Sequence, residues 1–448
     1  MGSRSGMAAL QRTIPASIVH QTRRHPHGRG VRARGKLVIV AAIADPKRED
    51  IEMLRLAGVF FLAAILGACT SHDGPYARAQ PVAAGKAPAQ DYPSKLGTLR
   101  VEEVATGLEF PWGLAFLPDG RMLVTEKPGR LLLLAADGTL LSEISGLPKI
   151  FVDGQAGLLD VALSPDFARD PWVYVSYAEP SMRGNLAGTA VLRGRLGEHA
   201  LSDVEVIYRQ EPKLSSGTHV GSRLVFDDAG YLFITQGENN KRPPAQDLDK
   251  LQGKLVRLNA DGSVPKDNPF VGREGARPEI WSYGHRNIEG AALHPVTRKL
   301  WTHEHGPQGG DEINIPEPGK NYGWPIITYG VNYSGDPIPE SVGTSAPGME
   351  QPHHYWKVSP AISGMAFYAA DRIPAWKHSL FIGALTQRNL IRLELDGDRI
   401  VEEERLLTDR NERIRDVRQG PDGRLYLLTD AADGKLLRVD LVPAGGAS

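Results

Sequence analysis

Cysteine is nearly absent from this chain of 448 residues, since Cys69 is the only one. A single cysteine excludes an internal disulfide, a CxxCH haem attachment and any zinc or iron–sulfur site built from cysteines. Long amphipathic helical stretches are also nearly absent, whereas 49 glycines and 33 prolines punctuate the chain densely. This profile favours an all-β protein.

The apolar run within residues 53–69 (MLRLAGVFFLAAILGAC) is too short to favour a membrane-spanning helix. It follows Arg55 and ends in Leu-Gly-Ala-Cys, which matches the bacterial lipobox, whose cysteine is acylated and becomes the mature N-terminus. A buried core helix is the alternative, but no amphipathic period is visible. We expect a lipoprotein signal peptide over 53–68, then an acylated Cys69 and a flexible tether over 69–95, rich at first in Ser, Gly, Pro, Ala and Gln. The protein would then face the periplasm from the bacterial cell envelope, held at the membrane by its lipid anchor only.

Residues 1–52 carry ten Lys/Arg against four Asp/Glu and stand upstream of the predicted signal. A secreted protein has no place for such a segment, so we interpret it as a non-native extension, with the start at Met53; a genuine basic arm is the alternative. Without residues 1–68 the chain has 41 Lys/Arg against 49 Asp/Glu, a net charge of about -8. This charge argues against a nucleic-acid partner.

Six segments share one pattern, an apolar strand, a turn rich in Pro, Asp or Gly, and a second strand. They are LAFLPDGRMLVTEK (114–127), VALSPDFARDPWVYVSY (161–177), LVFDDAGYLFITQGE (224–238), AALHPVTRKLWTHEHG (291–306), MAFYAADRIPAWKHSLFIGAL (365–385) and VRQGPDGRLYLLTD (417–430). Most are followed by another strand. A β-sandwich would not require six copies of one phrase, so we predict a six-bladed β-propeller with four-stranded antiparallel blades over residues 96–443.

The stretch HEHGPQGGDEIN (303–314) holds two histidines, three carboxylates and three glycines. A helical HExxH zinc site fails on spacing, because its second histidine would fall at Pro307. Calcium fits better, since it accepts carbonyl and carboxylate oxygens in irregular geometry. A solvated loop without chemistry remains the alternative at this point.

Other polar loops offer further candidates. His219 lies among small residues just before a strand, and Glu238 ends the next strand of that hairpin, so the two suit a general base and its orienting acid; a structural histidine is the alternative. Arg286-Asn287 is a polar pair in a second loop. In extended backbone Arg413 and Arg415 face the same way and suit a polyanionic ligand, although two solvated arginines have the same spacing.

In order along the chain, these segments resemble the soluble quinoprotein glucose/sorbosone dehydrogenase family, in its aldose sugar dehydrogenase branch, which uses pyrroloquinoline quinone (PQQ). The resemblance runs from about Leu99 to Leu441. Its most specific phrases are GQAGLLDVALSPDF, GTHVGSRLVFDDAGYLFITQGENN, AQDLDKLQGKLVRLNADGSVPKDNPF, SYGHRN, HGPQGGDEIN, KNYGWP, PAISGMAFY and RIRDV. It implies the same six-bladed propeller.

The resemblance also implies roles for the catalytic and metal-binding residues. His219 is similar to the base that takes the proton of the sugar C1 hydroxyl while hydride passes from C1 to C5 of PQQ, and Glu238 to the acid that orients it. Gly306 and Pro307 match the positions whose carbonyls hold a calcium ion, which polarises the quinone. A second, structural calcium site is implied by Glu312 with the backbone of Tyr322.

Further positions match residues that contact the cofactor in the family, and the resemblance implies which part of PQQ each would contact. They are Arg286 and Asn287 over the quinone oxygens, Arg413 and Arg415 on the PQQ carboxylates, Gln155 near cofactor and sugar, and Tyr333 and Ser359 as weaker candidates. One position departs from the pattern. Some relatives have a lysine facing the cofactor where this chain has Thr386, with Arg388 two residues further on.

The sequence therefore predicts a PQQ- and calcium-dependent dehydrogenase that oxidises aldose sugars to lactones. Because it has no haem motif, electrons must pass to an external acceptor, a cytochrome or a quinone-linked carrier. Two alternatives stay open at this point: a non-catalytic lipoprotein propeller that binds a sugar or a protein, and a calcium-dependent lactone hydrolase.

Overall fold

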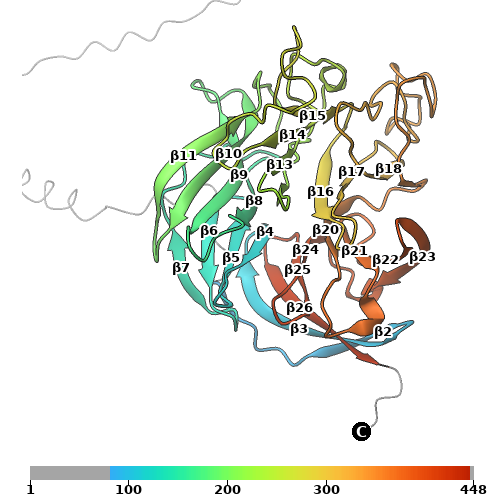
Figure 1. Cartoon of the computed structure of the whole chain (residues 1–448). Helices are drawn as coiled ribbons and strands as arrows, with labels where there is room; N and C mark the ends of the chain where they lie inside the picture. The colour runs from blue at the N-terminus through green and yellow to red at the C-terminus, as the bar shows by residue number, and fades with distance from the viewer. Residues whose placement is uncertain (1–80, 444–448) are drawn as a thin grey trace, which may run out of the picture. The chain divides into compact units, whose positions relative to one another are not determined.

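A computed structural model describes residues 81–443, and these residues form six antiparallel sheets arranged around a channel (Figure 1). Each sheet has four strands in chain order, except that the last is completed by strands from the N-terminal side. Helix within this range is limited to three short 3-10 turns, η1 (Pro243–Ala245), η2 (Pro374–Trp376) and η3 (Thr408–Arg410). None of them has the length and apolarity needed to cross a bilayer. The predicted six-bladed propeller is confirmed.

The blades follow one another along the chain. Blade 1 contains β4 (Pro111–Phe116), β5 (Met122–Glu126), β6 (Arg130–Leu134) and β7 (Leu140–Ile144); blade 2 contains β8 (Leu158–Leu163), β9 (Trp172–Pro180), β10 (Ala187–Leu196) and β11 (Leu201–Arg209). Blade 3 contains β12 (Leu224–Phe226), β13 (Leu232–Thr235), β14 (Lys254–Leu258) and β15 (Ile280–Tyr283); blade 4 contains β16 (Ile288–Leu293), β17 (Leu300–Glu304), β18 (Asp311–Asn314) and β19 (His354–Trp356). Blade 5 contains β20 (Ile362–Phe367), β21 (Ser379–Ala384), β22 (Asn389–Asp396) and β23 (Arg399–Leu406).

Blade 6 closes the ring. It contains β24 (Ile414–Gln419), β25 (Leu425–Thr429) and β26 (Gly434–Pro443), and its fourth strand is β3 (Gly97–Leu108). The register joins Val101 to Val439 and Leu99 to Leu441, so the two ends of the propeller sequence are held in one sheet. This pairing covers the edges that an open ring of sheets would expose.

The six repeated phrases form the first two strands of each blade. The turn of the first phrase, between β4 and β5, shows why they recur: Gly120 adopts φ 87° and its N–H donates to the Leu117 carbonyl at 2.9 Å. The corresponding turn between β12 and β13 uses Gly230, at φ 84°, in the same way with Asp227. Side chains disfavour this left-handed conformation, so glycine is the natural residue there.

Apolar side chains fill the spaces between blades. In β25 the consecutive residues Leu427 and Leu428 point to opposite faces, and Leu427 packs in the cluster shared with blade 5 while Leu428 packs in the cluster shared with blade 1. The same division recurs at Phe381 and Ile382 of β21. Each blade is therefore buried on both faces, which explains why the second strands are almost continuously apolar.

One part of the domain prediction is wrong. The composition predicts a flexible tether over 69–95, but Ala83–Ala84 (β1) and Gln90–Ser94 (β2) are strands that pair with β3. Asp91 bonds the Arg100 guanidinium at 3.0 Å, and Tyr92 packs against the core of blades 5 and 6. A polar strand of this kind forms because β3 offers an unpaired edge. Cys69 and the segments predicted over 1–52 and 53–68 lie outside the described residues.

Candidate active site

The predicted site residues gather at one end of the channel. The first strand of every blade packs against the first strand of the next, so these six strands are the innermost ones. All of them begin at this end of the channel. Gln155 and His219 lie shortly before β8 and β12, and Asn287 and Arg413 lie directly before β16 and β24. Loops far apart in the sequence thus meet around one mouth, the usual place for function in a propeller.

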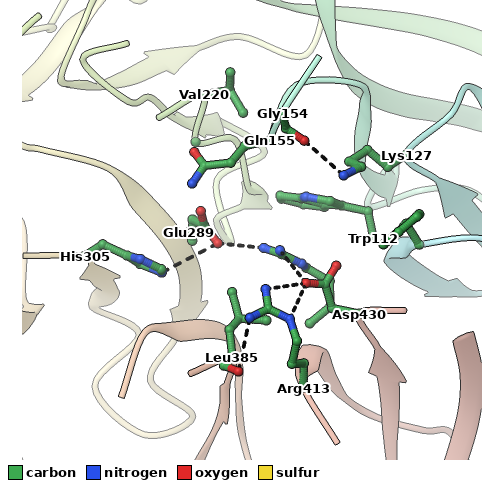
Figure 2. Close-up of a pocket in the computed structure, with 13 residues that line it drawn as sticks. Trp112, Lys127, Gly154, Gln155, Val220, Glu289, His305, Leu385, Arg413 and Asp430 are labelled. Carbon is green, nitrogen blue, oxygen red and sulfur yellow. Dashed lines mark hydrogen bonds and ion pairs between the residues drawn. The ribbon is translucent and has the colours of Figure 1, made fainter. Parts of the chain in front are cut away.

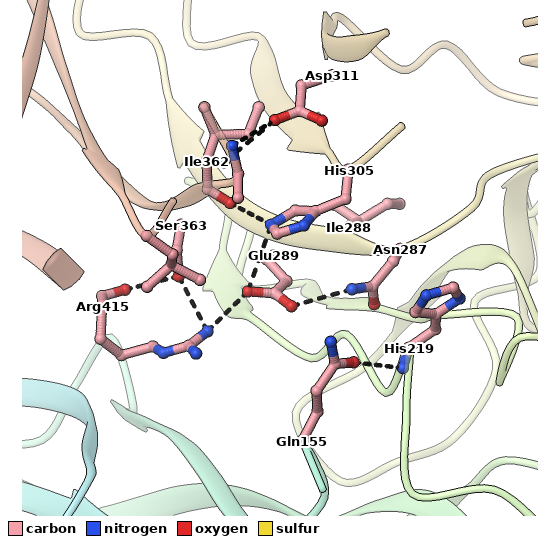
Figure 3. Close-up of polar contacts among 12 residues, drawn as sticks. Gln155, His219, Asn287, Ile288, Glu289, His305, Asp311, Ile362, Ser363 and Arg415 are labelled. Carbon is pink, nitrogen blue, oxygen red and sulfur yellow. Dashed lines mark hydrogen bonds and ion pairs between the residues drawn. The ribbon is translucent and has the colours of Figure 1, made fainter. Parts of the chain in front are cut away.

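His219 and Glu238 form a buried pair. His219 Nδ1 lies 3.1 Å from Glu238 Oε1, the imidazole is only 8% exposed and the carboxylate is fully buried. Backbone hydrogen bonds hold both partners in place. The His219 N–H donates to Gln155 Oε1 at 2.6 Å (Figure 3). The Glu238 N–H donates to the Arg286 carbonyl at 2.9 Å. His219 itself has φ 49°, an uncommon conformation for a residue with a side chain.

The electrostatics of this pair favour a base. Burial lowers the pKa of His219 below its usual value, Glu238 opposes this shift without overcoming it, and the Arg286 charge reinforces it. The imidazole is therefore neutral at neutral pH. With its Nδ1–H donated to Glu238, the ring keeps a lone pair on Nε2, which is the form that accepts a proton.

Arg286 and Asn287 join the loops of blades 3 and 4. Asn287 Oδ1 accepts the Gly221 N–H at 3.1 Å, and its Nδ2 donates to Glu289 at 2.9 Å. Arg286 Nη1 donates to the His305 carbonyl at 3.1 Å. Within residues 81–443 the buried Nε of Arg286 has no partner. Asn287 is thus fixed by protein contacts, whereas Arg286 retains an unused donor.

Arg413 and Arg415 line the same cavity, but both arginines have protein partners already. Arg413 donates to Asp430 at 2.9 and 2.6 Å, and Arg415 Nη1 donates to Glu289 at 2.7 Å (Figures 2 and 3). The Arg415 Nε, which is buried, has no partner in the described part of the chain. The two acids align the guanidinium groups in advance, so a ligand would meet ordered cations rather than free side chains.

Two adjoining cavities open at this end. The first has a volume of about 380 Å³ and is lined by Phe110, Trp112, Lys127, Gly154, Gln155, Val220, Gly221, Glu289, His305, Leu385, Arg413, Arg415 and Asp430. The second, of about 430 Å³, is lined by His305, Gly306, Pro307, Gln308, Gly309, Tyr333, Lys357, Val358, Ser359, Ala361 and Thr386. His305 belongs to both linings. Cations and aromatic rings in the first cavity fit a flat polyanion such as PQQ.

The peripheral candidates differ in how firmly they are held. Ser359 donates to Asp311 at 2.6 Å and is therefore oriented by the protein. Tyr333 is 77% exposed and Thr386 is exposed as well. Both line the second cavity from its solvent side, so neither is positioned by burial.

The residues expected to hold calcium have suitable oxygens. Gly306 and Pro307 are buried, and within residues 81–443 their carbonyls accept no hydrogen bond, which leaves them available to a hard cation. The described residues include no cluster of three or more His, Cys, Asp or Glu side chains suited to a metal, so backbone oxygens would have to contribute. The donor set therefore fits calcium and does not fit zinc.

Glu312 and Tyr322 lie together in a small interior space. Both line a cavity of about 10 Å³ that Glu304 also borders. Burial raises the pKa of Glu312 well above its usual value, and the neighbouring Glu304 charge adds to this effect. Two acids confined in this way suit a bound cation, as the resemblance implies for a second calcium site.

Of the residues that line the first cavity, only Gln155, Arg413 and Arg415 were predicted from the sequence. Those missed include Trp112, Lys127, Glu289, His305 and Asp430. A signal for two of them was present. Lys127 and Asp430 are the last residues of two of the six repeated phrases, the same relative position as Glu238. The second strand of each phrase ends at the channel mouth, so the end of the phrase marks a candidate site position.

Known proteins resemble this chain over most of its length. Residues 108–438 match the family model described as Glucose / Sorbosone dehydrogenase. Aldose sugar dehydrogenase YliI of Escherichia coli is 55% identical over 345 residues, which cover 76% of this chain and 93% of the relative.

Solved structures agree in fold. The soluble aldose sugar dehydrogenase of Escherichia coli, in its apo form, matches with a TM-score of 0.75 at 54% identity, covering 77% of this chain and 100% of that structure. The PQQ-bound form of an aldose sugar dehydrogenase from Streptomyces coelicolor matches with a TM-score of 0.63 at 29% identity, covering 78% and 100%.

Proposed function

The chain belongs to the glucose/sorbosone dehydrogenase family, and we propose that it oxidises aldose sugars at C1 to the lactone with PQQ and calcium as cofactors. The observation that carries the proposal is the buried His219, held by Glu238 at 3.1 Å beside a cavity lined with cations. A base next to a polyanion site is what sugar oxidation by a bound quinone requires. The sugar dehydrogenase relatives support the same activity.

In this proposal each residue has a distinct task. His219 Nε2 takes the proton of the C1 hydroxyl as hydride leaves C1, and Glu238 stabilises the imidazolium that forms. Arg286 directs its free N–H toward the developing negative charge, while Asn287 keeps the loops of blades 3 and 4 together. When bound, PQQ would supply the two-electron acceptor, held by Arg413 and Arg415, and calcium on the Gly306 and Pro307 carbonyls would supply a Lewis acid.

The surroundings of the enzyme are also part of the proposal. Because the single cysteine excludes a CxxCH haem attachment, electrons pass to an external acceptor, a cytochrome or a quinone-linked carrier. Acylation of Cys69 would hold the enzyme on the periplasmic side of the bacterial envelope, where an aldose substrate diffuses freely.

Reduction of a redox dye by the purified protein tests the proposal. PQQ and calcium are added together and then omitted in turn, against a panel of aldoses. Reduction that needs a sugar and both additions supports a quinoprotein dehydrogenase. Sugar binding without reduction favours a binding propeller, and lactone hydrolysis without PQQ favours a hydrolase.

A further inference from the structure

The three cations that line the first cavity have unequal partners. Arg413 pairs with Asp430 at 2.6 Å and Arg415 pairs with Glu289 at 2.7 Å. Lys127 has only the Gly154 carbonyl, 3.0 Å from its Nζ. Among the described residues that line this cavity, it is the one cation without a carboxylate within ion-pair distance. Three cations against two acids leave the cavity with surplus positive charge at Lys127.

The backbone of Lys127 is held by hydrogen bonds on both sides, although its ammonium has few partners. Its N–H donates to the Phe110 carbonyl at 3.0 Å, and its carbonyl accepts the Leu158 N–H at 3.0 Å. The ammonium lies 4.6 Å from the centre of the Phe110 ring. Figure 2 shows it beside Gly154, on the side of the cavity that Trp112 forms. This placement leaves two of its three N–H groups without a protein acceptor in the described part of the chain.

The surroundings favour an anionic ligand over a solvated lysine. Burial lowers the pKa of Lys127, Asp430 opposes this shift, and the charges of Arg415 and Arg413 reinforce it. A carboxylate entering the cavity would relieve both the desolvation and the repulsion between cations. In the neighbouring cavity Thr386 offers only a hydroxyl group, and the lysine of that lining, Lys357, is exposed to solvent.

We propose that Lys127 is a cofactor-positioning residue that pairs with a carboxylate of PQQ. The inference depends on the proposed function, because it requires PQQ to occupy this cavity. Lys127 would hold the cofactor from the blade 1 side, and Arg413 and Arg415 from the blade 6 side. A charged pair of this kind contributes to affinity and fixes the orientation of the ring system.

Direct binding of PQQ tests this role without relying on turnover. PQQ in the presence of calcium is titrated into wild type, Lys127→Gln, Lys127→Met and Lys127→Arg, with Kd measured by calorimetry. The neutral variants are expected to raise Kd by roughly 10- to 100-fold, the range for loss of a charged hydrogen bond. The arginine variant should recover part of the affinity. Lys266→Gln, which removes an exposed lysine outside both cavities, is the matched control.

Thermal unfolding of the variants without PQQ separates binding from folding, and Lys127→Met serves as a second variant because it keeps the aliphatic stem. Unchanged Kd in both neutral variants overturns the role of Lys127, while normal wild-type binding leaves the proposed function intact. Failure of wild type to bind PQQ overturns the proposed function itself. If every Lys127 variant, including the arginine variant, binds PQQ more weakly and also unfolds at a lower temperature, Lys127 is a structural residue only.

Discussion

The interior of the channel and its mouth contain the same types of charged side chain, but these side chains have different hydrogen-bond and ion-pair partners in the two regions. In the interior, the fully buried Arg223 forms ion pairs with Asp160 and Asp416, both at 3.1 Å. Its Nε donates to the Glu289 carbonyl at 2.9 Å, and an Nη donates to the Arg415 carbonyl at 3.1 Å. The guanidinium also stacks on the Trp112 ring of blade 1, with 4.1 Å between Cζ and the ring centre. One side chain thus connects the inner strands of five blades.

At the mouth, some donors of the same kinds of side chain lack partners in the described residues. The Nε atoms of Arg286 and Arg415 are buried without an acceptor in the described residues, and Lys127 has no carboxylate. Unsatisfied buried donors are costly to a protein fold. The difference teaches that charges in the interior hold blades together, whereas charges at the mouth are arranged for a ligand. Substitutions should therefore reduce stability in the interior and function at the mouth.

The largest functional effect is expected from His219→Ala. Removing the base should lower kcat by about 10²- to 10⁴-fold, the usual contribution of general-base catalysis. PQQ affinity should change little, whereas the unfolding temperature is expected to fall, because the fully buried Glu238 Oε1 loses its imidazole partner. Steady-state kinetics with saturating PQQ and calcium measure the effect. The exposed His199→Ala is the control, and near-normal turnover in His219→Ala would remove the base assignment.

Arg223→Leu tests the interior, where a loss of stability is expected rather than a loss of catalysis. It leaves Asp160 and Asp416 short of a buried partner, so the free energy of unfolding should fall by about 3–5 kcal/mol. Urea unfolding measures this loss. The exposed pair of Arg169 with Asp166 supplies the control, since Arg169→Leu is expected to leave the unfolding midpoint unchanged within error. If the Arg223→Leu protein is as stable as wild type but binds PQQ more weakly, Arg223 serves ligand binding rather than stability, and the distinction between the two regions fails.

His303, a buried residue of β17, makes the stability of the interior depend on pH. Its ring is fully buried, neither nitrogen has a partner within residues 81–443, and burial lowers its pKa from 6.5 to about 3. Below pH 6.5 the imidazole of His303 is protonated in the unfolded chain but stays neutral in the folded chain until the pH approaches 3. Stability is therefore lost as pH falls from 6.5 toward 3, by up to about 1.4 kcal/mol per pH unit from this residue.

His303→Leu should flatten the dependence of stability on pH by this amount between pH 6 and pH 4. Urea unfolding at several pH values measures both slopes, which should coincide above pH 7, where the histidine is neutral in both states. A wild-type slope that survives the substitution would assign the acid sensitivity to other groups. Because the His303 ring packs closely against Gly290, the substitution also changes the absolute stability, so the slope is the quantity to compare.

Local patterns predicted the fold well because each blade is built from consecutive hairpins. The turn at Gly120 and the alternation in β25 are encoded within a few residues. The first cavity is different. Lys127, Glu289 and Asp430 come from three blades and become neighbours only when the ring closes through β3 and β26. Their proximity depends on long-range geometry, which no local pattern contains.

The resemblance to a family located candidate residues that spacing alone left open. It placed His219 and Glu238 in one pair, and the structure brings them to 3.1 Å. It carried no information on Lys127, because that residue stands outside the phrases on which the resemblance rests. The strand β2 was missed for a physical reason: its residues QDYPS lack an apolar alternation and are ordered by the edge of β3.

The smallest effect is expected from Tyr333→Ala, at the outer limit of the mouth. Tyr333 lines the second cavity but is 77% exposed. Ordering so exposed a ring against a ligand costs side-chain entropy that offsets most of the surface it buries. The Kd for PQQ should therefore rise by no more than about threefold, roughly 0.6 kcal/mol. Calorimetric titration measures the change, with the exposed Val342→Ala, which lies outside both cavities, as control. A tenfold or larger rise would mean that the loop carrying Tyr333 closes on the cofactor, and the binding region of the mouth would then extend beyond the ordered charges to this exposed loop.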